Sequence, residues 1–413
     1  MMSHLMNTYG RQPVTFTHGE GVWLFDAHSN KYLDALSGVA VNGLGHAHPI
    51  LVAAIQAQVV KMIHVSNIYG IAEQEALADK LAEISGMDKV FFCNSGCEAN
   101  EASIKLARLY AHNKGVTNPE IIVMERSFHG RTMATLSATG NRKAQAGFEP
   151  LVSGFVRVPY DDLDAVKQIA SRKNNVVAIL VEPVQGEGGV HIPADMAAYF
   201  KGLRKVCDDN GWLLMLDEVQ SGIGRTGTWF AFQHTGILPD VMSLAKGLGS
   251  GVPIGACLAR GVAAETFVPG KHGSTFGGNP LATTAGLTTL EVIKSEKLRE
   301  NALAMGSMIC DGLRAALNGL AGIVAIRNAG LMVGVELDRP CAELVKMALQ
   351  NKLLINVTAD KVVRLLPPLV INEAEVKELV ARLSVLIKQF LSAPIEIKTD
   401  LKHHAKDLEK ATW

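Results

Sequence analysis

Hydrophobic and polar residues change their spacing several times along the chain. Near its start, the apolar segments 22–26 and 31–36 flank the polar turn 27–30, which is the pattern of a β-hairpin. Helical spacing of apolar residues follows at 50–63 and 72–84. The first part of the chain is therefore predicted to form a small β element and two helices.

From residue 88 onward, short apolar runs alternate with amphipathic segments. Strand-length runs lie at 89–93, 120–125, 176–183 and 212–219, and helical spacing lies at 98–111 and 196–209. This alternation predicts a mostly parallel sheet with helices on both faces. Ligands of such sheets bind beyond the carboxyl ends of the strands, so chemistry is expected in the residues that follow each strand.

The pattern changes again beyond residue 296. A helical segment at 297–317 leads to apolar segments at 322–330, 331–337 and 362–368, and a last helical segment follows at 373–390. This order predicts a smaller α+β domain. The polar, weakly patterned end of the chain is predicted to be a surface tail.

The composition narrows the class of protein. The 413 residues are 48% hydrophobic and 19% charged, which is typical of a globular protein and excludes a disordered chain. The 40 basic residues balance 40 acidic ones without a basic stripe, which argues against nucleic acid and acidic membrane surfaces as partners. The longest apolar runs have strand length, the start lacks a signal-peptide pattern, and the cysteines are scattered, so we expect a cytoplasmic protein.

Metal ligands are sparse in the sequence. Cys93 and Cys97 have C-x3-C spacing, and His46 and His48 have H-x-H spacing. Neither pair has a further ligand pair at the distance typical of a zinc site. We therefore predict no metal site.

One lysine stands out by its surroundings. Lys246 is the single charged residue of MSLAKGLGSGVPIG, and a lysine is rarely buried unless it is paired or used chemically. The alternative is that Lys246 lies along apolar surface with its ammonium in water. Motifs elsewhere in the chain have to decide between these two interpretations.

Two predicted strand ends carry residues suited to a small anionic ligand. Ser95, Gly96 and Cys97 form a turn of small residues into a helix, whose free backbone N–H groups and dipole suit a phosphate. Phe128 can lie against a planar ring, and Arg131 can bind a carboxylate in fork geometry. The plain structural interpretations are a helix cap, a core aromatic residue and a surface arginine.

A third predicted strand end is acidic. Asp217 follows an apolar run and is costly to bury there without a cation or a donor nearby. A phosphate turn, an aromatic ring, a buried aspartate and a lysine together indicate pyridoxal 5′-phosphate. The aldehyde of this cofactor forms a Schiff base with a lysine amine, and its ring nitrogen needs an acidic partner. On this hypothesis Lys246 is used chemically.

A nicotinamide-dependent oxidoreductase is the competing hypothesis. The segment GIGRTG at 222–227 matches the dinucleotide pattern G-x-G-x-x-G, and Asp240 follows at a suitable distance. That pattern has to enter a crossover helix, whereas the next segment, TWFAFQHTGILP, is short, aromatic and ended by proline. We therefore reject this hypothesis.

The ordered motifs extend over nearly the whole chain. They are GEGVWLFDAHSNKYLDALSGVAVNGLGHAHP, NSGCEANEA, SFHGRT, VEPVQGEGGV, LDEVQSGIGRTG, SLAKGLGSGVPIGA, HGSTFGGNPLA and VVRLLPPLVI. In this order they resemble the class III (ω-type) pyridoxal-phosphate aminotransferases. The resemblance implies an α/β protein of the aspartate-aminotransferase type (fold type I). Its large domain would have a mixed, mostly parallel sheet, and its smaller α+β domain would be built from both chain ends.

The same resemblance divides the chain into four parts. Residues 1–70 would contribute to the small domain and to dimer contacts, and residues 71–295 would form the large cofactor-binding domain. Residues 296–392 would complete the small domain, and residues 393–413 would form the polar tail.

The resemblance also implies roles in the cofactor site. Lys246 would bind the cofactor covalently and then move a proton, and Asp217 would keep the ring nitrogen protonated. The other implied cofactor contacts are Ser95, Gly96 and Cys97 at the phosphate, Phe128 and Val219 on the ring faces, Gln220 beside the phenolic oxygen, Glu218, and Thr275 from the other subunit. The family more often has threonine or alanine where this chain has Cys97. Because Thr275 would come from the other subunit, the resemblance also implies a homodimer with shared active sites.

Two arginines would let one site serve two substrates. Arg364 would bind the α-carboxylate of glutamate or 2-oxoglutarate and Arg131 the distal carboxylate, with Ser274 facing the substrate. An ω-amino donor brings no carboxylate to Arg364, so Glu187 would pair with it, because an unpaired buried guanidinium is costly. Glu182 would support the pocket.

Val39 bears on the choice of donor. It stands where free-ornithine aminotransferases have a tyrosine that addresses the α-amino group, and an apolar residue suits an acylated nitrogen. We therefore expect transfer of the ω-amino group of N-acetylornithine to 2-oxoglutarate, in arginine metabolism. N-succinylornithine, succinyl-diaminopimelate, ornithine and 4-aminobutyrate stay open as donors. A pyridoxal-binding protein without turnover is disfavoured because Lys246, Asp217 and both arginines are present.

Overall fold

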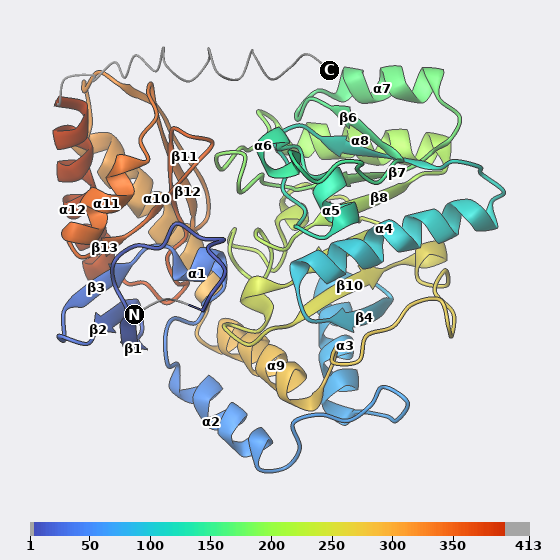
Figure 1. Cartoon of the computed structure of the whole chain (residues 1–413), viewed down its shortest axis with the longest axis horizontal. Helices are drawn as coiled ribbons and strands as arrows, with labels where there is room; N and C mark the ends of the chain where they lie inside the picture. The colour runs from blue at the N-terminus through green and yellow to red at the C-terminus, as the bar shows by residue number, and fades with distance from the viewer. Residues whose placement is uncertain (1–3, 393–413) are drawn as a thin grey trace.

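The computed structural model describes residues 4–392, which contain one large sheet and two smaller ones (Figure 1). The large sheet has seven strands in the order β4-β10-β9-β8-β7-β5-β6. These strands are β4 (Lys89–Cys93), β5 (Glu120–Met124), β6 (Phe155–Val158), β7 (Val176–Val181), β8 (Leu213–Asp217), β9 (Val241–Leu244) and β10 (Gly255–Ala259). The tail predicted at 393–413 lies outside the described residues.

The direction of the strands decides where a ligand can bind. Strand β10 is antiparallel to its neighbours β4 and β9, whereas the pairs from β9 to β6 are parallel. The carboxyl ends of β4, β5, β7, β8 and β9 therefore meet at one edge, together with the start of β10. The predicted mixed, mostly parallel sheet is confirmed.

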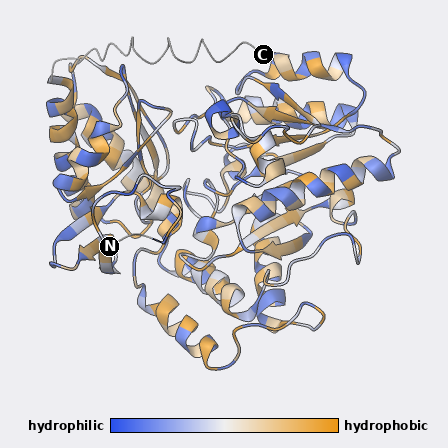
Figure 2. Ribbon diagram, viewed as in Figure 1, coloured by the Kyte–Doolittle hydropathy of each residue, from blue (hydrophilic) through white to orange (hydrophobic). Residues whose placement is uncertain are grey.

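Helices cover both faces of the large sheet because its strands are apolar on both faces, as the orange strands of Figure 2 show. Successive residues point to opposite faces. Leu213 and Met215 pack with α4 (Gly96–Asn113), whereas Leu214 and Leu216 share a core with Tyr199 and Phe200 of α8 (Met196–Asn210). The shorter helices here are α5 (Met133–Ala138), α6 (Arg142–Gln145) and α7 (Leu163–Arg172).

The two smaller sheets form a second body, which we call the small domain. One sheet has the order β11-β12-β15-β14, with β11 (Ile323–Ala329), β12 (Met332–Leu337), β14 (Asn356–Thr358) and β15 (Val362–Leu365). The other has the order β1-β2-β3-β13, with β1 (Phe16–Glu20), β2 (Trp23–Asp26), β3 (Lys31–Asp34) and β13 (Leu353–Leu354). Helices α10 (Leu298–Ala316), α11 (Glu343–Gln350) and α12 (Glu373–Ser392) pack on these strands.

The second small sheet joins the two ends of the chain. Strand β3 pairs in parallel with β13, so that Leu33 lies opposite Leu353. The β2–β3 hairpin predicted near the start of the chain is confirmed. The exact division of the chain at residues 70, 295 and 392 stays a prediction.

Three helices link the small domain to the large sheet: α2 (Pro49–Val59), α3 (Ala72–Ser85) and α9 (Pro280–Ser295). Helices α2 and α3 both pack on α9. A short segment, α1 (Ser37–Ala40), has left-handed backbone at Gly38 and Val39. No helix within residues 4–392 is long and apolar enough to cross a membrane.

Candidate active site

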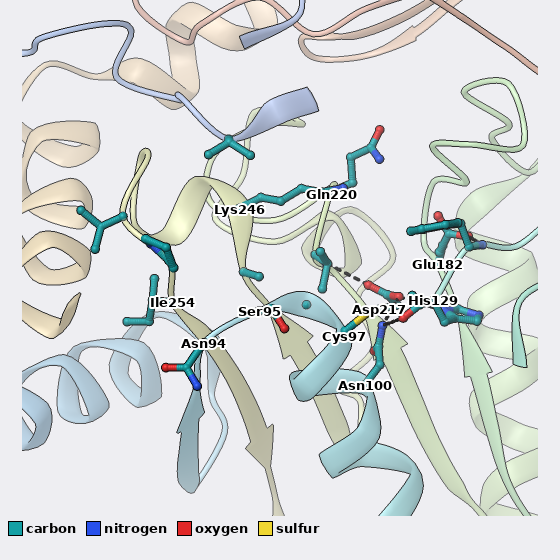
Figure 3. Close-up of a pocket in the computed structure, with 18 of the residues that line it drawn as sticks. Asn94, Ser95, Cys97, Asn100, His129, Glu182, Asp217, Gln220, Lys246 and Ile254 are labelled. Atoms are coloured by element: carbon teal, nitrogen blue, oxygen red, sulfur yellow. Dashed lines mark hydrogen bonds and ion pairs between the residues drawn. The ribbon is translucent and has the colours of Figure 1, made fainter. Parts of the chain in front are cut away.

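A cavity of about 310 Å³ lies at the carboxyl edge of the large sheet (Figure 3), and we call it the sheet-edge cavity. Its wall comes from residues that follow β4, β5, β7, β8 and β9 and from the segment before β10. It includes the predicted residues Ser95, Gly96, Cys97, Phe128, Asp217, Val219, Gln220 and Lys246. Val41, Asn94, Asn100, His129, Gly130, Glu182 and residues 251–254 also line it. The strand-end argument therefore locates the cavity correctly.

Asp217 is held as an acceptor by three donors. Its Oδ2 accepts hydrogen bonds from Asn100 Nδ2 at 2.7 Å and from His129 Nδ1 at 2.8 Å, and its Oδ1 accepts from Val219 N at 3.0 Å. All but 4% of the Asp217 surface is buried. Because every donor is fixed by the fold, the carboxylate is oriented before any ligand arrives.

Asn100 and His129 are functional candidates that no sequence pattern indicated. Both are buried, and His129 Nε2 and Asn100 Oδ1 have no hydrogen-bond partner among residues 4–392. His129 must carry its proton on Nδ1 to donate to Asp217. Both residues lie inside the motifs named above, and His129 directly follows Phe128. The sequence offered one signal for them, because a buried Asp217 needs hydrogen-bond donors from elsewhere in the chain.

Lys246 lies just beyond β9, at the start of a short 3-10 turn, η2 (Lys246–Leu248), and its φ is 44°. Its Nζ makes no hydrogen bond or ion pair within the described part of the chain. Burial lowers the pKa of its ammonium, and the positive charge of Arg364 lowers it further. An amine that deprotonates more easily is a better nucleophile, which is the property that carbonyl chemistry requires.

The turn at 95–97 has the features of an anion site. Ser95 caps α4, since its Oγ accepts a hydrogen bond from Glu98 N at 3.2 Å. The backbone N–H groups at the start of α4 have no partner within the helix. A Cβ at Gly96 would lie 2.6 Å from Val219 Cγ1, so only glycine allows this close approach. Cys97 Sγ accepts a hydrogen bond from Arg131 N at 3.0 Å.

Glu182 joins two walls of the sheet-edge cavity. It is buried, and its two carboxylate oxygens accept hydrogen bonds from Phe128 N at 2.9 Å and Gly186 N at 3.1 Å. Burial raises its pKa to about 7, and the charge of Asp217 adds to the effect of burial. Glu182 thus fixes the aromatic residue and the start of the segment that carries Glu187, which is the supporting place expected for it.

Arg364 and Glu187 form an ion pair. Arg364 Nη2 lies 2.8 Å from Glu187 Oε1, with the Arg364 side chain 1% exposed and that of Glu187 37% exposed. Arg364 also donates from Nη1 to Gln220 Oε1 and from Nε to Asn356 Oδ1, both at 3.1 Å. Each nitrogen of the buried guanidinium thus has a partner, and the carboxylate of Glu187 can still reach solvent.

A second cavity, of about 1,100 Å³, lies between the large sheet and the small domain. We call it the interdomain cavity. Phe128, Arg131 and Glu187 line it, so it adjoins the sheet-edge cavity at Phe128. Arg131 lies 5.8 Å from the centre of the Phe128 ring. Arg126, Arg131 and Arg142 of this wall are exposed, and none forms an ion pair with another residue in 4–392.

Five predicted residues do not line either cavity: Arg364, Glu218, Val39, Ser274 and Thr275. Glu218 is buried and accepts hydrogen bonds from Ser221 Oγ at 2.5 Å and Phe232 N at 2.8 Å, on the side away from the cavity. The structure therefore does not bring Glu218 to the predicted cofactor site, because its side chain points opposite to that of Asp217. Val39 has a φ of 65° and packs with an apolar cluster that contains Val184 and Val190.

Ser274 and Thr275 lie near the anion turn but on a separate loop. Ser274 Oγ accepts hydrogen bonds from Asn94 Nδ2 at 3.3 Å and from Gly277 N at 2.9 Å, and Asn94 is a wall residue of the sheet-edge cavity. Thr275 is exposed. Among residues 4–392, no group of three or more His, Cys, Asp or Glu side chains is arranged to hold a metal ion.

Comparisons with known proteins identify the family and several relatives of this chain. The sequence pattern of the family described as aminotransferase class-III matches residues 6–387. The chain is 61% identical to the acetylornithine aminotransferase of Nitrosomonas europaea over 395 residues, which cover 96% of this chain and 100% of that protein. It is 55% identical to acetylornithine aminotransferase 1 of Bordetella bronchiseptica, over 95% of this chain and 99% of that one.

Solved structures are similar as well. The ornithine aminotransferase of Toxoplasma gondii superimposes with a TM-score of 0.90 at 34% identity, over 94% of this chain and 93% of that one. The acetylornithine aminotransferase of Elizabethkingia anophelis gives a TM-score of 0.83 at 33% identity, over 94% and 97%.

Proposed function

This chain belongs to the class-III aminotransferase family, and from that premise we propose that it transfers the ω-amino group of N2-acetyl-L-ornithine to 2-oxoglutarate. The products are N-acetyl-L-glutamate 5-semialdehyde and L-glutamate. The observation that carries the proposal is the Arg364–Glu187 ion pair beside Lys246, since such a pair lets one site accept substrates with and without a carboxylate at the reacting carbon. High identity to two acetylornithine aminotransferases supports this donor.

The residues of the sheet-edge cavity fit pyridoxal 5′-phosphate. They offer an unpartnered amine at Lys246, a fixed carboxylate at Asp217, free N–H groups at the start of α4 and the ring of Phe128. Each of these groups matches one part of the cofactor: its aldehyde, its ring nitrogen, its phosphate and its ring face. When bound, the cofactor withdraws electrons from the substrate carbon and so makes a proton on that carbon acidic.

The protein residues then have distinct roles. Lys246 Nζ would hold the cofactor covalently and would also take and return a proton at the substrate carbon, a role for which a lowered pKa is suited. Asp217 holds a proton on the ring nitrogen by its negative charge, and Asn100 and His129 keep its carboxylate in place. Val219 and Phe128 exclude water from the ring faces. Ser95, Gly96 and Cys97 bind the phosphate.

Two carboxylate sites explain the two substrates. For 2-oxoglutarate or glutamate, Arg364 binds the carboxylate next to the reacting carbon and Arg131 binds the distal one, with Glu187 displaced. For the acetylated donor, Arg131 binds the carboxylate at the far end, and Glu187 stays on Arg364. The partial exposure of Glu187 supports this exchange, because its carboxylate can turn toward solvent.

We propose a homodimer with shared active sites. Large apolar side chains are exposed over α2, the following residues and a loop near residue 270: Ile50, Val52, Val59, Val60, Met62, Ile63, Ile68, Tyr69, Val268 and Phe276. Asn67 Nδ2 donates to the carbonyls of Ser274 and Gly277, which ties the two segments together. Exposed apolar side chains on segments that contact each other indicate a protein partner, and Thr275 directly precedes the exposed Phe276. The six free cysteines are consistent with a reducing cytoplasm.

The experiment that tests the function measures both half-reactions on the purified holoenzyme. Addition of N-acetylornithine should bleach the visible absorbance of the bound cofactor, and 2-oxoglutarate should restore it. The value of kcat/KM should be about ten- to a hundredfold higher for N-acetylornithine than for free ornithine, because the apolar side chain of Val39 offers a free α-ammonium no partner. A preference for free ornithine would overturn the acetylornithine assignment.

A further inference from the structure

Residues 185–191, which we call the switch turn, carry Glu187. Gln185 N donates to His191 O, and His191 N donates to Gln185 O, both at 3.0 Å, so the turn is closed at its base. Two hydrogen bonds fix it to the large sheet: Gly186 N donates to Glu182 Oε2 at 3.1 Å, and Gln185 Nε2 donates to a backbone carbonyl after β5 at 2.8 Å. These contacts hold only the first two residues of the turn.

The far side of the switch turn is held by Arg327 on β11 of the small domain. Arg327 Nη2 donates to Gly189 O at 2.6 Å, and its Nε donates to Val190 O at 2.9 Å. Its remaining nitrogen, Nη1, lies 2.8 Å from Glu336 Oε2. One planar guanidinium therefore binds two adjacent carbonyls and an orienting carboxylate. A lysine, with a single nitrogen, cannot reproduce this fork.

We infer that Arg327 is a positioning residue for Glu187, which keeps the Glu187 carboxylate on Arg364 while an ω-amino donor reacts. The inference rests on the proposed function, because it presupposes that Glu187 pairs with Arg364 in one half-reaction and leaves it in the other. Thr358 of the small domain assists by donating from Oγ1 to the carbonyl of Glu187.

The reason is geometric. Arg364 is on β15 and Arg327 is on β11, and both strands belong to one small-domain sheet, joined through β12. Arg327 therefore fixes the turn to the same body that carries Arg364. With the turn fixed, Glu187 can leave Arg364 only by rotation of its own side chain. Without Arg327, the whole turn can move, and the carboxylate spends less time at Arg364.

The test compares the two half-reactions by single-turnover absorbance in Arg327→Gln. The N-acetylornithine half-reaction should slow by about three- to tenfold relative to the glutamate half-reaction, the range expected when one hydrogen-bonded anchor is lost. Arg327→Lys should show a smaller change in the same direction. Hydrogen exchange of the backbone amides at 186–191 should become faster in Arg327→Gln, which is a readout independent of turnover.

Arg314→Gln is the matched control. Arg314 also donates to a carbonyl next to Arg327, that of Ile326 at 3.0 Å, and also pairs with a carboxylate, Asp311. It is on α10, away from the switch turn, so both half-reactions should change equally or not at all.

A thermodynamic cycle with Glu187→Ala separates positioning from general stabilisation. The double variant Arg327→Gln/Glu187→Ala should show no more asymmetry than Glu187→Ala alone. If Arg327→Gln slows both half-reactions equally, or if its effect adds fully to that of Glu187→Ala, the inference is wrong. If Glu187→Ala itself shows no asymmetry, the switch in the proposed function fails first, and the inference fails with it.

Discussion

The sheet-edge cavity and the interdomain cavity differ in how their side chains are held. In the former, Asp217 and Glu182 are buried, and each accepts hydrogen bonds at both carboxylate oxygens. In the latter, Arg126, Arg131 and Arg142 are exposed and make no ion pair within residues 4–392. The first is therefore organised before a ligand arrives, whereas these three arginines of the second offer charge that a ligand has to organise.

This contrast between the two cavities indicates where each step of the reaction is decided. Chemistry that is the same for both substrates belongs in the fixed cavity, because electrostatic catalysis depends on groups that need no rearrangement. Selection between substrates of different length and charge belongs where side chains can still move. Arg364 and Glu187 lie between the two: the arginine is buried and the glutamate is partly exposed.

Loss of the fixed amine should have the largest effect. Lys246→Ala should lower kcat for transamination by about 10²–10⁴-fold or more, since a positioned proton-transfer group typically contributes that much. The variant should still bind the cofactor through Asp217 and the 95–97 turn, but borohydride should no longer fix the cofactor to the chain. Lys201→Ala, at an exposed position of α8, is the control and should behave as wild type. Substantial turnover by Lys246→Ala would contradict the assignment.

The boundary between the two cavities can be tested at Glu187. Glu187→Ala should favour the glutamate half-reaction over the N-acetylornithine half-reaction by about tenfold, less than for a fully buried pair because Glu187 is partly exposed. Single-turnover absorbance measures each half-reaction separately. Equal changes in the rates of both half-reactions would mean that Glu187 does not act as a switch between the two substrates.

Substrate selection can be tested at Val39, which packs with an apolar cluster and lines neither cavity. Val39→Tyr should raise kcat/KM for free ornithine relative to N-acetylornithine by a few-fold, because the tyrosine hydroxyl can hydrogen-bond to the free α-ammonium. The upper limit of this gain is the free energy of about one hydrogen bond to a charged group. Because Val39 already has left-handed backbone, which β-branched residues rarely adopt, tyrosine should not add strain there. An unchanged ratio would confine selection to the cavity walls.

The smallest effect is expected behind the sheet edge, at Glu218. Burial raises the pKa of Glu218 to about 7, so its ionisation in the folded protein is unfavourable. The folded state then binds this proton more tightly than the unfolded state, and the free energy of unfolding falls as pH rises from about 4.5 to 7. Glu218→Gln removes this term while its amide can still bond to Ser221 and Phe232. The Tm of the variant should rise relative to wild type by about 1–3 °C at pH 8, with little gain at pH 5.

The sequence predicted the fixed cavity far better than the adaptable one. Asp217 ends a strand, and Lys246, Phe128 and the 95–97 turn each follow one. Parallel strands bring their carboxyl ends together whatever the rest of the chain does. Glu218 shows the limit of this argument, because the residue after a strand-end side chain points the other way.

Other features could not be predicted from local pattern. The hydrogen bonds of Asn100 and His129 to Asp217 join residues far apart in sequence, and no periodicity indicates such contacts. Arg327 could not be identified either, since its function depends on how the small domain packs against the 185–191 turn. The interdomain cavity as a whole depends on that packing.

The parallel pairing of β3 with β13 has a consequence for synthesis on the ribosome. Residues 31–34 leave the exit tunnel early, but their partner strand at 353–354 is made only after most of the chain. At ribosomal rates of about 5–20 residues per second, the β1–β3 hairpins wait on the order of tens of seconds with β3 unpaired on its outer side. Nascent chains that end before residue 353 should therefore lose their first 36 residues to protease readily. Chains that extend past α12 should protect them.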